Sequence, residues 1–102
     1  MDAYDLSKIT IDDFSKYLHQ TMDVQFTDTQ ATPAVLTKVT ALDSYTPIER
    51  SPFSLELQTR GDYTNRQQGI YPILHPDIKE LNLFLVPIGP DANGMRYEAV
   101  FS

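Results

Sequence analysis

The chain of 102 residues contains no cysteine. This absence excludes disulfide bonds, metal sites built from thiolates and catalysis by a cysteine nucleophile. A chain of this length is close to the commonest size of one domain and buries roughly two-thirds of its unfolded surface. It therefore needs neither disulfides nor metals to fold. We expect a single domain over residues 1–102.

Basic residues are also scarce. The chain has 8 lysines and arginines against 14 aspartates and glutamates, which gives a net charge of −6 and a pI near 4.6. A surface of this sign repels phosphate backbones and anionic lipid surfaces. We therefore expect no nucleic-acid partner and no membrane partner, and the acidity itself is best explained by solubility.

Long apolar runs are absent. No stretch approaches the length needed to cross a bilayer. The first residues, Met1-Asp-Ala-Tyr-Asp5, are acidic and lack the basic start and apolar core of a signal peptide. With 41 % hydrophobic and 22 % charged residues the composition is that of a folded globular domain. We expect a cytoplasmic protein.

The familiar motifs of catalysis are missing as well. The sequence has no G-x-S-x-G elbow, no H-E-x-x-H pair and no phosphate-binding or dinucleotide-binding loop. The glycines of Gly89–Gly94 are explained by a hairpin turn, because glycine and asparagine tolerate positive φ. We therefore expect no cofactor, no metal site and no catalytic residues, and we expect that the chain is not an enzyme.

A helical pattern is present near the start of the chain. Four apolar residues recur at the spacing of one helix face: Ile11, Phe14, Tyr17 and Leu18. Thr10 followed by Asp13 resembles a capping box, with the acidic group at the positive end of the helix. The pattern predicts a short amphipathic helix over residues 11–20 that covers a core.

The rest of the chain follows a period of two, which is typical of strands. Strands are predicted over residues 22–27, 34–44, 53–60, 70–74, 81–88 and 95–101. In 53–60 the polar residues should face water, and Pro72 should place 70–74 at an edge or a bulge because proline cannot donate to a ladder. We predict a mainly β (α+β) fold: a small antiparallel six-stranded barrel or sandwich with the N-terminal helix packed on it.

The last hairpin is apolar on both faces of its first strand. We assign Phe84 and Val86, with Tyr97 and Phe101 of the returning strand, to the core. The opposite face then offers an interface for a partner, and its candidate residues are Leu81, Leu83, Leu85, Arg96 and Glu98. For the two charged residues an intramolecular ion pair is an equally good explanation.

The C-terminal third resembles a family of small bacterial proteins that is described as a domain of unknown function. The resemblance lies in Gln68-Gly-Ile-Tyr71, Leu74-His-Pro-Asp77, Leu83-Phe-Leu-Val-Pro-Ile-Gly-Pro-Asp91 and Gly94-Met-Arg-Tyr-Glu-Ala-Val-Phe101. It implies no catalytic residues. Some relatives are encoded near genes like those of phage tail collars, and this context favours a structural or interaction role.

Three functions follow from these observations. The first is a non-enzymatic protein-interaction or structural module, accessory to a phage-tail-like assembly, with a protein partner or self-association. The second is a small-ligand-binding β-barrel with Tyr63, Tyr71 and Tyr97 at its mouth. The third is a hydrolase that uses His75 and carboxylates, among them Asp77. A pair such as Glu98 with Glu56 or Asp91 is a separate candidate for carboxylate chemistry, and a turn role for His75 is preferred.

Overall fold

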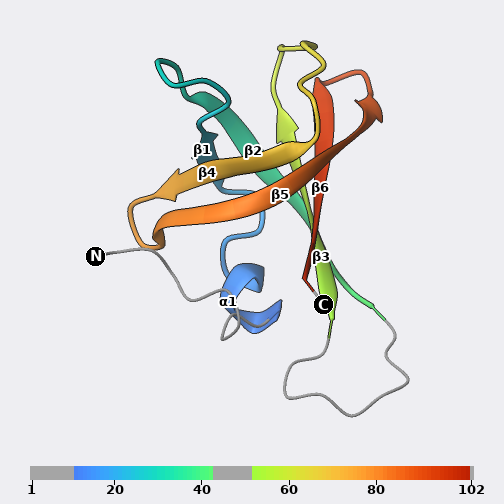
Figure 1. The fold of residues 1–102 in the computed structure, drawn as a ribbon. Coiled ribbons are helices and arrows are strands. Elements are labelled where there is room, and N and C mark those ends of the chain that lie inside the picture. Colours follow the sequence, from blue (N-terminus) through green and yellow to red (C-terminus); the bar gives the residue numbers. More distant parts are fainter. Residues whose placement is uncertain (1–10, 43–51, 102) are drawn as a thin grey trace.

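The computed structural model describes residues 11–42 and 52–101 of the chain. In this part, six strands form one closed antiparallel barrel in the order β1-β2-β3-β6-β5-β4 (Figure 1). The elements are α1 (Ile11–Ser15), β1 (Thr21–Val24), β2 (Thr32–Ala41), β3 (Phe53–Thr59), β4 (Gly69–His75), β5 (Lys79–Pro90) and β6 (Met95–Phe101). The mainly β fold is confirmed, and of the two predicted architectures the structure is the barrel.

The interior of the barrel is filled by apolar side chains that the strands contribute at alternate positions. They belong to one buried cluster: Met22, Val24, Ala34, Leu36, Phe53, Leu55, Leu57, Ile73, Leu81, Leu83, Leu85, Met95, Tyr97, Ala99 and Phe101, with Phe14 and Ile78 at its margins. A six-stranded barrel is narrow, so its interior holds side chains rather than a lumen. Burial of this cluster is the main favourable contribution to folding.

The helix is shorter than predicted. α1 ends at Ser15, and the next hydrogen bonds join the N–H of Tyr17 to the carbonyl of Phe14 and that of Leu18 to Ser15, the spacing of a tighter turn. His19 has a φ of 71°, a left-handed conformation that cannot continue a helix. The predicted helix over 11–20 is therefore wrong after Ser15, and Thr10 of the predicted cap lies outside the described residues.

Phe14 is the buried side chain of α1 and belongs to the core. Its ring lies 5.6 Å from that of Phe101 and 6.2 Å from that of Phe53, measured between ring centroids. Leu18 of the predicted stripe is 37 % exposed. No helix in the described part of the chain is long and apolar enough to cross a membrane.

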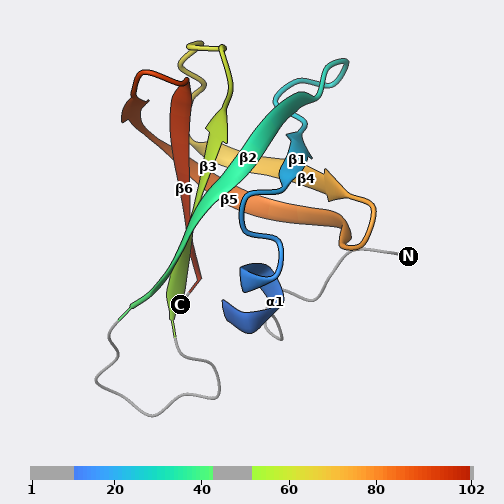
Figure 2. The same cartoon turned by 180° about the vertical axis from the view of Figure 1, so that it is seen from behind.

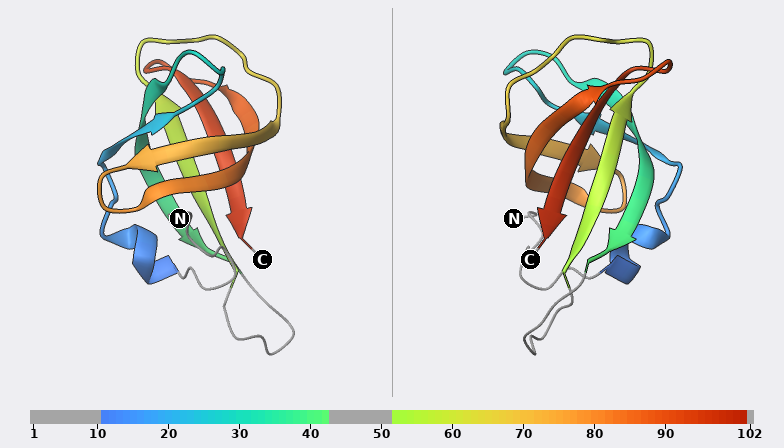
Figure 3. Two further views of the ribbon diagram at one scale, coloured as in Figure 1. Left: turned by 60° about the vertical axis from the view of Figure 1, so that its left-hand side comes forward. Right: turned by 90° about the vertical axis from the view of Figure 1, so that its right-hand side faces the viewer.

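The two ends of the barrel differ. α1 lies at one end, beside the start of β3 and the end of β6 (Figure 2). The connections 25–31, 60–68 and 91–94 gather at the opposite end, above the barrel in both views of Figure 3. The 60–68 connection joins β3 to β4.

The face assignment of β5 is opposite to the predicted one. Leu81, Leu83 and Leu85 point into the barrel and are at most 3 % exposed, whereas Phe84 is 52 % exposed. Val86 is half-buried on the outer face, and Tyr97 and Phe101 are buried as predicted. Because both faces of this strand are apolar, the alternation alone did not decide which one the closed barrel would enclose.

The outer face of β3 is less exposed than predicted. Ser54 and Gln58 are 8 % and 3 % exposed, although their alternation with leucines predicted a face in water. The side-chain amide of Gln58 donates to the carboxylate of Asp91 and, at 3.3 Å, to the carbonyl of Gly94. The β5–β6 turn therefore folds over the end of β3 and covers it.

The face assignment of β5 predicts a contrast between two neighbouring residues. Leu83→Ala should lower the free energy of unfolding by about 2–5 kcal/mol because it leaves a cavity in the core. Phe84→Ala should lower it by less than about 1 kcal/mol, because the side chain already faces solvent. Urea denaturation of both variants measures the difference. A larger loss for Phe84→Ala would restore the original face assignment.

The close packing around Gly94 predicts that two glycine-to-alanine variants differ in stability. A Cβ at this position would overlap the backbone carbonyl of Thr59, and φ is +156°. Gly94→Ala should therefore destabilise the fold by about 2–5 kcal/mol. The matched control is Gly61→Ala, where φ is +73° but no atom lies within 4 Å; backbone strain there should cost about 1–2 kcal/mol. Equal losses in thermal or urea denaturation would show that the close approach to Thr59 is unimportant.

Candidate functional site

The barrel closes through a short ladder between β1 and β4. The register pairs Asp23 with Leu74 and Val24 with Ile73. One further hydrogen bond, 2.9 Å from the N–H of Gln25 to the carbonyl of Pro72, extends it. Proline has no N–H to return, so this pair is held by one bond in place of two. The predicted edge position of this strand is wrong, because β4 pairs with both β1 and β5 in the closed barrel. The missing donor of Pro72 instead faces β1 at the point where the pairing stops.

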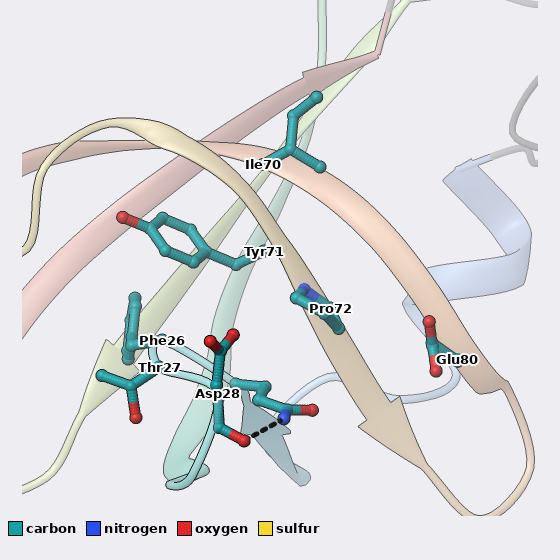
Figure 4. Close-up of a pocket in the computed structure, with 8 residues that line it drawn as sticks. Phe26, Thr27, Asp28, Ile70, Tyr71, Pro72 and Glu80 are labelled. Carbon is teal, nitrogen blue, oxygen red and sulfur yellow. Dashed lines mark hydrogen bonds between the residues drawn. The ribbon is translucent and has the colours of Figure 1, made fainter.

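After Gln25, the segment that follows β1 no longer runs alongside β4. The N–H of Phe26 turns back to the carbonyl of Val24 at 3.1 Å, and the side-chain amide of Gln25 approaches the carbonyl of Asp28 at 3.4 Å. A pocket of about 300 Å³ lies between this segment and β4 (Figure 4). We call it the seam groove; it is lined by Gln25, Phe26, Thr27, Asp28, Ile70, Tyr71, Pro72 and Glu80.

The main chain of Ile70 faces the seam groove. In an antiparallel strand, alternate residues direct their N–H and C=O toward the same neighbour. The bond from Gln25 to Pro72 shows that the even-numbered residues of β4 face β1. Ile70 therefore points its donor and acceptor to the side where β1 has ended, and no described residue of segment 25–31 pairs with it. This is a sheet edge one residue long inside a closed barrel.

Aromatic rings form one wall at the loop end of the seam groove. Phe26 lies 5.0 Å from Tyr71 and 5.1 Å from Tyr97, measured between ring centroids. The guanidinium carbon of Arg66 lies 5.2 Å from the centroid of Phe26. The chain thus already places a cation on this cluster of rings, in the arrangement expected for cation–π attraction.

The three tyrosines predicted to line a barrel mouth do lie at one end, but their hydroxyls hold the loops. Tyr97 donates to the carbonyl of Thr64 at 3.0 Å, Tyr71 to Gln67 at 2.6 Å and Tyr63 to Ala92 at 2.8 Å. Burial raises the pKa of Tyr97, against the opposing effect of the Arg66 N–H that its oxygen accepts. The tyrosines therefore fix connection 60–68 across the barrel end.

Two carboxylates accept hydrogen bonds from the backbone of these same loops. The backbone N–H of Thr64 donates to Asp62 at 2.9 Å, and this bond holds the pKa of Asp62 below its ordinary value. The N–H of Asn93 donates to Asp91 at 2.7 Å, with the same effect on the pKa of Asp91. Within the described ranges no group of three or more His, Asp or Glu side chains is placed to hold a metal ion.

Two large apolar side chains lie exposed beside the seam groove. Ile70 of β4 and Phe84 of β5 are register partners and are 69 % and 52 % exposed. Since the polar groups of Ile70 face away from β5, the two residues form a non-hydrogen-bonded pair, the kind whose side chains lie closer together. We call them the outer apolar pair.

The residues predicted for an interface do not form one surface. Leu81, Leu83 and Leu85 are inside the barrel and are not available to a partner. Arg96 and Glu98 are half-buried on the outer face of β6, where the Nε of Arg96 donates to the carbonyl of Gly89 at 3.1 Å. Their role at an interface stays a prediction.

The structure also places the groups considered for hydrolysis. The Nε2 of His75 lies 3.0 Å from the amide oxygen of Gln20, and its Nδ1 accepts the backbone N–H of Asp77 at 3.1 Å. Asp77 therefore contacts the His75 ring through its backbone N–H and not through its carboxylate. This bond makes His75 a cap of the β4–β5 turn. Glu56 and Glu98 are register partners on β3 and β6, and their carboxylates share the outer face.

Comparison with known proteins gives one match. No curated protein and no solved structure matches the chain significantly. Residues 9–101 match the family DUF6916, a domain of unknown function, so the match covers α1 and all six strands of the barrel. The seam groove and the outer apolar pair lie within it. The chain therefore belongs to the DUF6916 family.

Proposed function

We propose that the chain is a non-enzymatic protein-interaction module that binds its partner through the outer apolar pair and the adjoining seam groove. The observation that carries the proposal is the exposure of Ile70 and Phe84 at paired positions. The core is filled without them, so their apolar surface is available to another chain. A cluster of large exposed apolar side chains rimmed by polar residues is typical of interaction sites.

The surface is continuous with the seam groove. Ile70 belongs to both, and Pro72, two residues along the same face of β4, is half-buried in the groove wall. A partner side chain that enters the groove would thus come from a segment that also covers Phe84. Apolar contact at the centre with polar groups at the rim is the usual anatomy of such interfaces.

A small-ligand barrel has less support. The interior is occupied by the core, and the tyrosine hydroxyls expected at a mouth donate to loop carbonyls. The seam groove is outside the barrel, and its volume of about 300 Å³ is at the lower end of ligand pockets. An open groove of that size suits one or two side chains of a protein partner better than an enclosed metabolite.

The proposal includes a setting. The resemblance of the C-terminal third to small bacterial proteins, some of them encoded near genes like those of phage tail collars, favours an accessory role in a phage-tail-like assembly. The proposal places this module in the cytoplasm. A protein partner, or a second copy of the chain, would then be the binding target.

The test uses matched surface variants in a quantitative capture from the bacterial host. Ile70→Ser with Phe84→Ser should lose the specific partner, because the apolar contact is removed while the core is untouched. Val100→Ser is the control, since Val100 is 58 % exposed on β6 near Arg96 and Glu98. Mass spectrometry against an unrelated bait reports retained proteins, and circular dichroism confirms the fold.

The variants separate the two candidate surfaces. Retention by Val100→Ser and loss by the double variant supports the outer apolar pair. Loss by Val100→Ser with retention by the double variant would move the interface to Arg96 and Glu98 on β6. Specific binding that is unchanged in every variant would contradict the proposal.

A further inference from the structure

We infer that the partner presents a short, extended, basic segment, which lies along β4 in the seam groove and pairs with the main chain of Ile70. The inference rests on the proposed function and specifies the chemistry of the partner. It is carried by three features of the described residues: an unpaired stretch of strand, the outer apolar pair beside it and two carboxylates.

The main chain of Ile70 can form hydrogen bonds with an extended segment of the partner. The N–H and C=O of Ile70 point into the groove at the position that β1 would occupy if it continued past Val24. An extended segment placed there makes the two bonds that the ladder lacks, which is strand addition to a sheet edge. Pro72 fixes the register, because it has no N–H and its carbonyl is already taken by Gln25.

The acidic side chains of the groove favour a positively charged segment. Asp28 and Glu80 are exposed and line the groove on either side of Pro72 (Figure 4). Arg66 already lies over Phe26, so this ring face is occupied by a cation of the chain itself. A lysine or arginine of the segment is therefore attracted by the two carboxylates rather than by the rings.

Charge also argues against a second copy of the chain as the occupant. The chain carries a net charge of −6. Docking one seam groove against another would bring two sets of Asp28 and Glu80 together, and like charges at a contact are unfavourable. A basic segment is attracted to the same surface, with an association rate that falls as salt is added.

The length of the segment is limited by the groove. Only Ile70 offers main-chain groups on this side of β4, and the outer apolar pair lies directly beside it. The residue that pairs with Ile70 directs its side chain to the same outer face as Ile70 and Phe84, so an apolar side chain is expected there, and a basic side chain of a neighbouring residue lies near Asp28. The affinity of such a segment alone is modest, and the rest of the partner would add to it.

The test titrates defined peptides into the ¹⁵N-labelled full chain. The probe is acetyl-Val-Lys-Val-Lys-Val-amide, and its control carries glutamate in place of lysine. The lysine peptide should shift the amide resonances of Phe26, Ile70 and Tyr71, and the glutamate peptide should not bind. Asp28→Asn with Glu80→Gln should weaken the lysine peptide about tenfold, as loss of a charge-assisted contact does. Asp12→Asn on α1, which removes one exposed carboxylate away from the groove, is the control and should leave binding unchanged.

Main-chain pairing is tested with two N-methylated versions of the lysine peptide. One carries the methyl groups on its valines and the other on its lysines, so that each blocks one edge of the extended peptide. Because one edge faces β4, one version should bind about tenfold more weakly and the other should retain its affinity. Equal affinity of both versions would overturn strand addition.

The outcomes separate the two proposals. Equal binding of the lysine and glutamate peptides, or resonance shifts confined to other faces, overturns the inference. If this happens while Ile70→Ser with Phe84→Ser still loses the captured partner, the proposed function stands and the basic extended segment is wrong. Binding of the lysine peptide that depends on Asp28, Glu80 and one peptide edge supports it.

Discussion

The missing N–H of Pro72 is the constraint on which the exposed features of this barrel depend. It halves the last hydrogen-bonded pair between β1 and β4, the two strands that close the barrel. β1 is four residues long, so little of the ladder remains to hold the seam together. The chain departs immediately after Gln25, and the seam groove opens there.

The closure of the barrel and the opening of the seam groove therefore have different physical origins. The barrel stays closed because the core is continuous across the seam: Met22 and Val24 of β1 pack in the same cluster as Ile73 of β4. At the seam groove, only the backbone hydrogen bonds between β1 and β4 are interrupted. This division lets a fold with a filled interior present a piece of sheet edge, together with Ile70 and Phe84, on its outside.

Much of the fold was predictable from the sequence, because alternation and turn residues locate strands without reference to the rest of the chain. The six strands show this. The face of β5 was not, since leucines on one side and Phe84 and Val86 on the other give no preference. Glu80 and Asn82 share a face with Phe84, and these polar residues were the available signal that the face is the outer one. The seam groove needed the register between β1 and β4, which no local pattern contains.

The central claim is that Ile70 directs its amide into an open seam while its neighbours are paired. Native-state hydrogen exchange measured by NMR tests it residue by residue. The account predicts that the amide of Ile70 exchanges rapidly, whereas those of Tyr71, which faces Leu83, and Leu74, which faces Asp23, stay protected. Protection of Ile70 equal to that of Tyr71 and Leu74 would show that the seam is closed and would contradict the account.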